Sequence, residues 1–205
     1  MISRRNFFLG GALAALAPTG VAKAMESRLA LSVNRLEGGS SLMRRACIAL
    51  DRHGSSIAAQ DRIGIVDFSL PSRQPRFHIV DMASGMRETI WVAHGRGSDP
   101  DHSGWVERFS NAPGSLASSA GAYVTGDLYV GKHGRSRRLI GLEPSNNNAE
   151  ERAIVIHGAW YVSPDMAERT GKMGRSEGCL AVAEDHIEMV LDRLGAGRLI
   201  YVDKA

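Results

Sequence analysis

Short apolar runs separated by Gly, Pro and Ser dominate the chain from residue 60 onward, and they predict a β-rich domain. Runs of this length with β-branched and aromatic residues between turn residues are typical of strands. The predicted strands are residues 63–68, 76–81, 89–93, 122–125, 127–130, 153–157 and 198–202. A short helix is predicted at residues 184–194, whose apolar residues share one face and which ends at Gly195.

Residues 25–59 carry a different pattern, in which apolar residues recur at the spacing of a helix face. The clearest stretch is residues 42–50, with Ser41 as an N-cap candidate and Gly54 after its end. We therefore expect a helical N-terminal segment at 25–59 and one β-rich domain at 60–205.

The first 24 residues read as an export signal. Arg4 and Arg5 precede an apolar stretch at residues 10–17, and an Ala-x-Ala site ends at Ala24. The paired arginines resemble a twin-arginine signal. An uncleaved anchor is the alternative, although the stretch is shorter than the roughly 20 residues that span a bilayer. We expect a periplasmic or otherwise exported protein with no stable membrane span after signal cleavage.

Composition and charge narrow the range of partners. The chain has 205 residues, 43% of them apolar, and a formal net charge of +3, to which the basic residues of the export signal contribute. No Lys/Arg block with interleaved aromatic residues occurs, which argues against a nucleic-acid partner. The length suits one domain with appendages.

The two cysteines have different surroundings. Cys47 lies on the apolar face of the helix predicted at 42–50, where a free Cys behaves as a small hydrophobic residue. Cys179 follows a glycine-rich approach that contains Gly174 and Gly178. Glycines of this kind let the main chain turn sharply next to a ligand. The pattern favours Cys179 as a nucleophile, and a disulfide between the two cysteines remains the alternative.

A catalytic thiol needs a base and a group that stabilises the oxyanion. His157, at the end of a predicted buried strand and followed by Gly158, is the candidate base. The amides of Gly178 and Cys179 are candidate oxyanion donors. A zinc site built from His94, His133 and His157 is a competing interpretation, but the chain has no recognisable zinc-ligand motif.

These residues resemble the L,D-transpeptidase (YkuD-like) catalytic domains. His157-Gly158 followed by Gly174-x-Ser176-x-Gly178-Cys179 resembles the active-site pattern of that family, and the likeness extends over about residues 60–203. The other segments that carry it are residues 66–69, 92–98, 109–115, 131–134 and 152–158. Glu177 departs from the family, because many relatives have His at this position.

The resemblance implies a mainly β, sandwich-like fold with a few short helices. It also implies that Cys179 is the acylated nucleophile, that His157 is its base, and that Ser176 and Gly178 complete the catalytic loop. The implied partners are peptidoglycan stem peptides, and the implied reaction is acyl transfer through a thioester, with no cofactor and no metal. Glu177 is then either a group that orients the incoming amine or one that raises the pKa of the thiol.

Other polar residues near these motifs are candidates for substrate binding. They are His94, Gly158, Arg152 and Arg175, and the two arginines suit substrate carboxylates. Three functions remain open: a transpeptidase, a cysteine hydrolase (L,D-carboxypeptidase or amidase) that trims stem peptides or releases wall-bound protein, and a non-catalytic wall-binding module.

Overall fold

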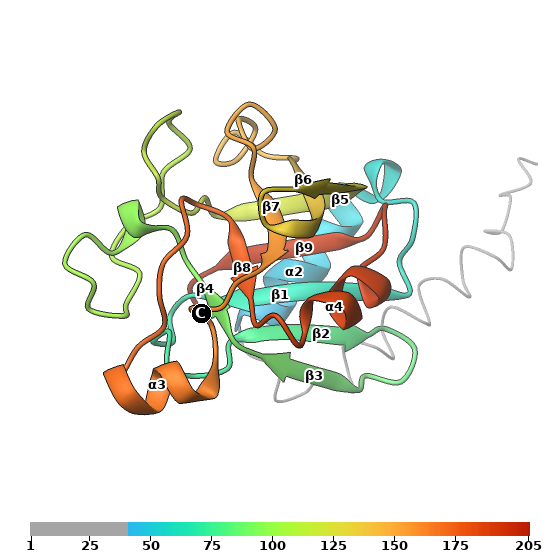
Figure 1. The fold of residues 1–205 in the computed structure, drawn as a ribbon. Helices are drawn as coiled ribbons and strands as arrows, with labels where there is room; N and C mark the ends of the chain where they lie inside the picture. The colour runs from blue at the N-terminus through green and yellow to red at the C-terminus, as the bar shows by residue number, and fades with distance from the viewer. Residues whose placement is uncertain (1–40) are drawn as a thin grey trace, which may run out of the picture.

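The computed structural model describes residues 41–205 and confirms a mainly β fold (Figure 1). The predicted export signal at 1–24 and the predicted helical residues 25–40 lie outside the described residues. Nine strands form one mixed sheet in the order β3-β2-β1-β9-β5-β6-β7-β8-β4. The strands are β1 Arg62–Asp67, β2 Phe77–Asp81, β3 Arg87–Ile90, β4 Val92–Ala93, β5 Gly121–Gly131, β6 Gly134–Gly141, β7 Val155–Gly158, β8 Leu180–Val182 and β9 Leu199–Asp203.

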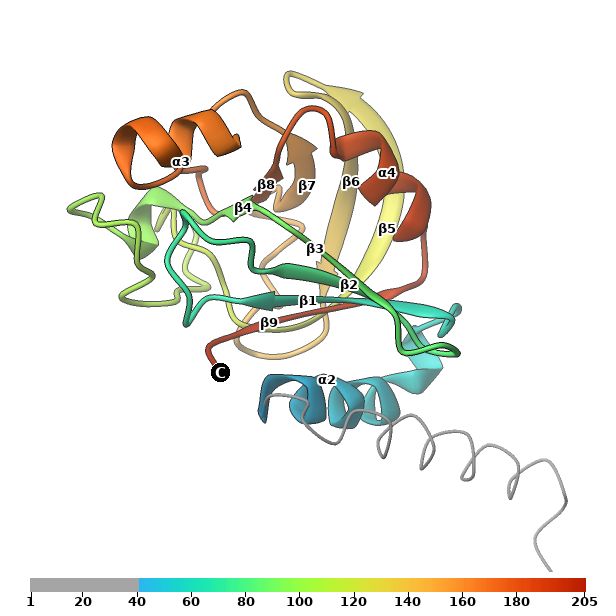
Figure 2. The same ribbon diagram turned by 90° about the horizontal axis from the view of Figure 1, so that it is seen from below.

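The sheet bends into two layers around one apolar core (Figure 2). β3 and β4 are the two ends of the strand order, yet Trp91 alone separates them in sequence. The core joins side chains from both layers, such as Phe77 of β2 and Ile156 of β7, neither of which is exposed to solvent. This arrangement agrees with the sandwich-like fold that was expected.

Within residues 41–205, three α-helices cover the sheet. α2 (Ser41–Arg52) packs its apolar face against β1 and β9, on the outer side of that layer (Figure 2). α4 (Ile187–Arg193) contributes Val190 to the main core. α3 (Pro164–Thr170) begins after Ser163, whose hydroxyl caps the Met166 amide, and lies near β4 and β8. Two single 3-10 turns occupy Gly54–Ser56 and Arg96–Ser98.

The structure corrects several element boundaries. The run predicted at 89–93 is divided between β3 and β4, and the two runs predicted on either side of Gly126 are one strand, β5, with an irregularity between Thr125 and Leu128. The pattern did not predict β6, β8 or α3. The helix predicted at 184–194 begins later, at Ile187. Within residues 41–205, no helix combines the length and the apolar character needed to cross a membrane.

Candidate active site

The candidate nucleophile and base lie on adjacent parallel strands. β7 pairs with β8 so that His157 stands opposite Ala181, and Cys179 comes directly before β8. Ile156 and Leu180 belong to the main core. Because side chains alternate along a strand, His157 and Ala181 point away from that core, and Cys179, two residues before Ala181, is in phase with them. The sheet thus places the thiol and the imidazole on the same face.

Hydrogen bonds within the loop fix its shape before Cys179. The Ser176 hydroxyl donates to the Cys179 carbonyl (2.7 Å), and its oxygen accepts from the Gly178 amide (3.2 Å). Gly178 has φ 118°, and a Cβ there would lie 2.8 Å from the Ala117 carbonyl oxygen. Only glycine suits this conformation and this close approach. Since the Gly178 amide already has a partner, the Cys179 amide remains as the candidate oxyanion donor.

The His157 ring is oriented by the main chain. Its Nδ1 lies 2.9 Å from the Gly158 carbonyl oxygen, and a carbonyl can only accept, so Nδ1 carries the proton. Nε2 is then the unprotonated, basic nitrogen. Burial, with smaller contributions from His133 and Lys132, lowers the pKa of His157 to about 4, despite the opposing effect of the Gly158 hydrogen bond. The ring is therefore neutral at physiological pH.

The Cys179 thiol meets both an acceptor and a donor of the main chain. Its Sγ donates to the Ala153 carbonyl (3.7 Å) and faces the Val155 amide. Burial raises the pKa of this thiol, whereas the Val155 amide, Lys132 and Arg152 act to lower it. Thiol and imidazole are thus both neutral at rest, and proton transfer between them has to accompany attack on a carbonyl.

Glu177 also bears on the thiol. Its carboxylate pairs with Arg96 at 2.9 Å on the surface, and its negative charge contributes to the raised pKa of Cys179. Of the two roles considered for Glu177 in the sequence, the structure supports the electrostatic one.

Lys132 and Glu177 carry opposite charges near the thiol, so neutralising each of them should change the reactivity of Cys179 in opposite directions. We expect Lys132→Met to slow alkylation of Cys179 by iodoacetamide at neutral pH, and Glu177→Gln to accelerate it, each by about two- to fivefold, as for partly screened charges. The pH profile of the alkylation rate measures this, with the midpoint moving up for Lys132→Met and down for Glu177→Gln. Shifts in the same direction for both variants would contradict it.

Ala153, whose carbonyl faces the thiol, has a strained backbone. Its φ is 52°, in the left-handed region, and its side chain is exposed. Because glycine adopts this conformation without penalty, we expect Ala153→Gly to stabilise the protein by about 1 kcal/mol. Ala112 is also exposed but does not have a positive φ, so Ala112→Gly should destabilise the protein. Urea denaturation of both variants measures the difference, and destabilisation by Ala153→Gly would contradict the assignment.

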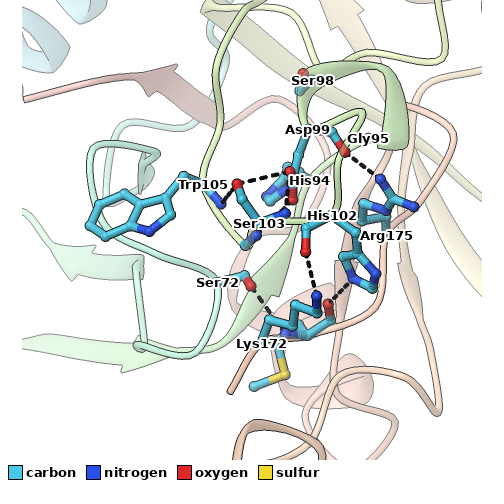
Figure 3. Close-up of polar contacts among 12 residues, drawn as sticks. Ser72, His94, Gly95, Ser98, Asp99, His102, Ser103, Trp105, Lys172 and Arg175 are labelled. Atoms are coloured by element: carbon cyan, nitrogen blue, oxygen red, sulfur yellow. Dashed lines mark hydrogen bonds and ion pairs between the residues drawn. The ribbon is translucent and has the colours of Figure 1, made fainter. Parts of the chain in front are cut away.

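His94 lies in a completely buried polar network (Figure 3). Its Nδ1 is 2.7 Å from Arg76 Nη2, and its Nε2 is 3.1 Å from Asp99 Oδ2. Arginine only donates, so Nδ1 accepts and Nε2–H donates to the carboxylate. Burial and the Arg76 charge lower the pKa of His94 to about 4. The ring therefore offers no free polar atom to a substrate.

Asp99 is the main acceptor of this network. It accepts hydrogen bonds from the amides of Ser103 (2.6 Å) and Gly104 (2.9 Å) and from the Ser103 hydroxyl (3.0 Å). Arg76, with a pKa lowered to about 9 by burial, also donates to the Val92 and Leu70 carbonyls. All the polar atoms of this network thus contribute to fixing the segment that follows β4.

That segment holds the nucleophile loop. The Ser176 amide donates to the His94 carbonyl (2.9 Å), and the Arg96 amide donates back to the Ser176 carbonyl (2.8 Å). A Cβ on Gly95 would lie 2.7 Å from Gly178 Cα. His94 therefore contacts the nucleophile loop through its main-chain carbonyl, and the hydrogen bonds of its imidazole to Arg76 and Asp99 hold that main chain in place.

The two arginines considered for substrate binding contact the main chain. Arg152 donates to the Ser110 carbonyl (2.8 Å), the Ser119 hydroxyl (2.6 Å) and the Ala117 carbonyl. Arg175 donates to the carbonyl of Asp99 (Figure 3) and to that of Pro100 (3.1 Å). Gly158 lies against Ile187 of α4 and supplies the carbonyl that orients His157. The side chains of Arg152 and Arg175 therefore hold loops of the site in place.

The sequence did not identify several residues of this site. Arg76 and Asp99 are distant in sequence from each other and from the Cys motif, and Lys132 lies in a turn. His133, which the sequence suggested as a zinc ligand, lies in the same turn and stacks on His157. Cys47 and Cys179 are both free. Within the part of the chain that the structure describes, no three His, Cys, Asp or Glu side chains are grouped as metal ligands.

Comparison with known proteins identifies the family of this chain. A family model described as the L,D-transpeptidase catalytic domain matches residues 38–202. A search of curated proteins found no match.

Solved structures also align with the chain at low identity. An L,D-transpeptidase from Mycobacterium tuberculosis H37Rv is 13% identical over 70% of this chain and 58% of its own, with a TM-score of 0.44. One from Mycobacterium smegmatis is 12% identical over 70% and 58%, with a TM-score of 0.42. An L,D-transpeptidase in complex with imipenem is 14% identical over 71% and 60%, with a TM-score of 0.43. The alignments thus span less than two thirds of those chains.

Proposed function

This chain belongs to the L,D-transpeptidase catalytic-domain family, and on that premise we propose that it transfers acyl groups of peptidoglycan stem peptides through a thioester on Cys179. The observation that carries this proposal is the pairing of β7 with β8, whose register puts His157 and Cys179, the residue before β8, on the same face of the sheet. The loop before the thiol and the tautomer of the imidazole both suit such chemistry.

In the proposed acylation, His157 Nε2 takes the thiol proton as Sγ attacks the carbonyl of the third stem residue. The Sγ–C bond forms, and the Cys179 amide donates to the developing oxyanion. The C–N bond to the terminal D-amino acid then breaks, and the leaving amine takes the proton from the imidazolium. The products are a thioester and a free D-amino acid.

In the second half, an amine of another stem peptide attacks the thioester. His157 Nε2 removes a proton from that amine, a new amide bond forms, and the thiol is regenerated when it regains the proton. The electrostatics support this order, because a neutral thiol and a neutral imidazole exchange one proton in each half-reaction. The substrate lies outside the cytoplasm, which suits the export signal expected at residues 1–24.

Muropeptide analysis tests this function. Purified protein is incubated with tetrapeptide-containing muropeptides, and the products are separated and identified by mass spectrometry. We expect dimers joined through the carbonyl of the third stem residue, and none with the Cys179→Ala variant. Tripeptides without dimers would replace the transpeptidase with the hydrolase, and unchanged muropeptides would overturn both.

A further inference from the structure

The tip of the β5–β6 hairpin covers the candidate base. β5 and β6 pair until Gly131 stands opposite Gly134, so Lys132 and His133 form the turn. β6 pairs in turn with β7, with Ser136 opposite His157. This register brings the His133 ring onto the His157 ring, with centroids 4.1 Å apart and planes inclined by 20°.

The turn itself does not require an imidazole. Gly134 has φ 74°, a conformation that glycine adopts readily, and its identity is explained by the hairpin geometry. His133 is exposed, whereas His157 is only 1% exposed. A flat ring stacked at this distance shields one face of its neighbour from water, and such pairs contribute beyond the area that they bury.

From this arrangement we propose that His133 is a positioning residue of the active site, which holds the His157 ring in place by stacking on it. The inference rests on the proposed role of His157 as the base. One hydrogen bond, from Nδ1 to the Gly158 carbonyl, fixes the His157 ring at one edge. The stacked ring fixes its plane, so that Nε2 keeps one direction while it accepts and returns the proton.

The charges around the two rings favour a neutral stack. Burial is the largest cause that lowers the pKa of each imidazole, and the positive charge of Lys132, next to His133, lowers both further. Glu177, across the site, acts in the opposite direction on His133, and its carboxylate is paired with Arg96. His133 itself lowers the pKa of His157: it adds to the burial of the ring, and a protonated His133 would repel the imidazolium that forms when His157 gains the thiol proton.

Two substitutions separate stacking from imidazole chemistry. His133→Phe keeps a flat ring, and His133→Ala removes it. Val130→Ala is the matched control, because Val130 lies on the same hairpin, is 77% exposed and makes no stack with His157. Melting temperatures of all three variants establish that they are folded.

The readouts are the pKa and tautomer of His157, from NMR of the labelled imidazole, and the rate of Cys179 acylation by a carbapenem. We expect His133→Ala to raise the pKa of His157, to move the acid limb of the acylation rate to higher pH, and to slow acylation by about tenfold, as for a misplaced general base. His133→Phe should stay within about threefold of the wild type, and Val130→Ala should match it.

Two results would overturn the inference. One is a His133→Ala variant whose His157 titration and acylation rate equal those of the wild type. The other is a His133→Phe variant as impaired as His133→Ala, which would assign the role to imidazole chemistry instead of stacking. A wild-type protein that forms no carbapenem adduct would count against the proposed function, while the NMR titration would still decide the role of His133.

Discussion

The Cys179→Ala variant is expected to form no covalent adduct with a carbapenem and to lose acyl transfer by about 10⁵- to 10⁶-fold, as when a covalent nucleophile is removed. The reason is local: Cys179 is the thiol beside His157, between the main-chain acceptor of Ala153 and the donor of Val155. Alanine keeps the loop, because the side chain of residue 179 is not part of the Ser176 hydrogen bonds. Intact-mass spectrometry measures the adduct.

Cys47 provides the matched control. It is a free thiol like Cys179, but it is 5% exposed on the inner face of α2, and burial, together with Asp51, raises the pKa of its thiol. The Cys47→Ala variant should therefore form the carbapenem adduct on Cys179 as fast as the wild type. An adduct on the Cys179→Ala protein, or its loss in Cys47→Ala, would refute the assignment of the nucleophile.

The second large effect concerns stability. Asp99→Ala removes the acceptor for His94, for the amides of Ser103 and Gly104 and for the Ser103 hydroxyl, and it deprives buried Arg76 of a nearby negative charge. Ser103 is exposed, but His94, Arg76 and the Gly104 amide are buried, and leaving these three groups without their partner costs about 3–5 kcal/mol of unfolding free energy. Asp99→Asn keeps part of the hydrogen bonding and should be intermediate. Urea denaturation followed by circular dichroism measures both.

Asp101 is the control for this prediction, because it lies two residues away and is exposed. Asp101→Ala should change the free energy of unfolding by no more than about 0.5 kcal/mol. We also expect folded Asp99→Ala protein to be acylated more slowly than the wild type, because the His94 main chain holds Ser176. Equal stability of the Asp99→Ala and Asp101→Ala proteins would show that the buried network is not a stabilising element.

The sequence predicted those elements whose residues show a clear local pattern. α2, β1, β2, β7 and β9 all lie where apolar periodicity indicated them, because each buries a regular apolar face. β6 was missed, since four consecutive polar residues, Arg135 to Arg138, hide the burial of Ser136 and Arg137. The division at Trp91 was missed as well, because the two halves of that run pair with opposite ends of the sheet.

The same contrast holds for the site. Cys179, His157 and Gly178 stand in short motifs, so their neighbours in the sequence were enough to make them candidates. His94 was expected to bind substrate, because its partners Arg76 and Asp99, which occupy both ring nitrogens, are identifiable only in the folded chain. His133 depends on the registers of two strand pairs, which the pattern of a turn does not reveal.

The position of β9 has a consequence for synthesis of the protein. β9 lies between β1 and β5 and pairs with both, parallel to β1 and antiparallel to β5. The strand pairing that links β1 to β5 and β7 therefore cannot form until residues 199–203 have been synthesised. Long-range pairings of this kind slow folding and leave strand edges exposed in the meantime. The nascent chain thus completes the sheet around its candidate active site only after β9 has been synthesised.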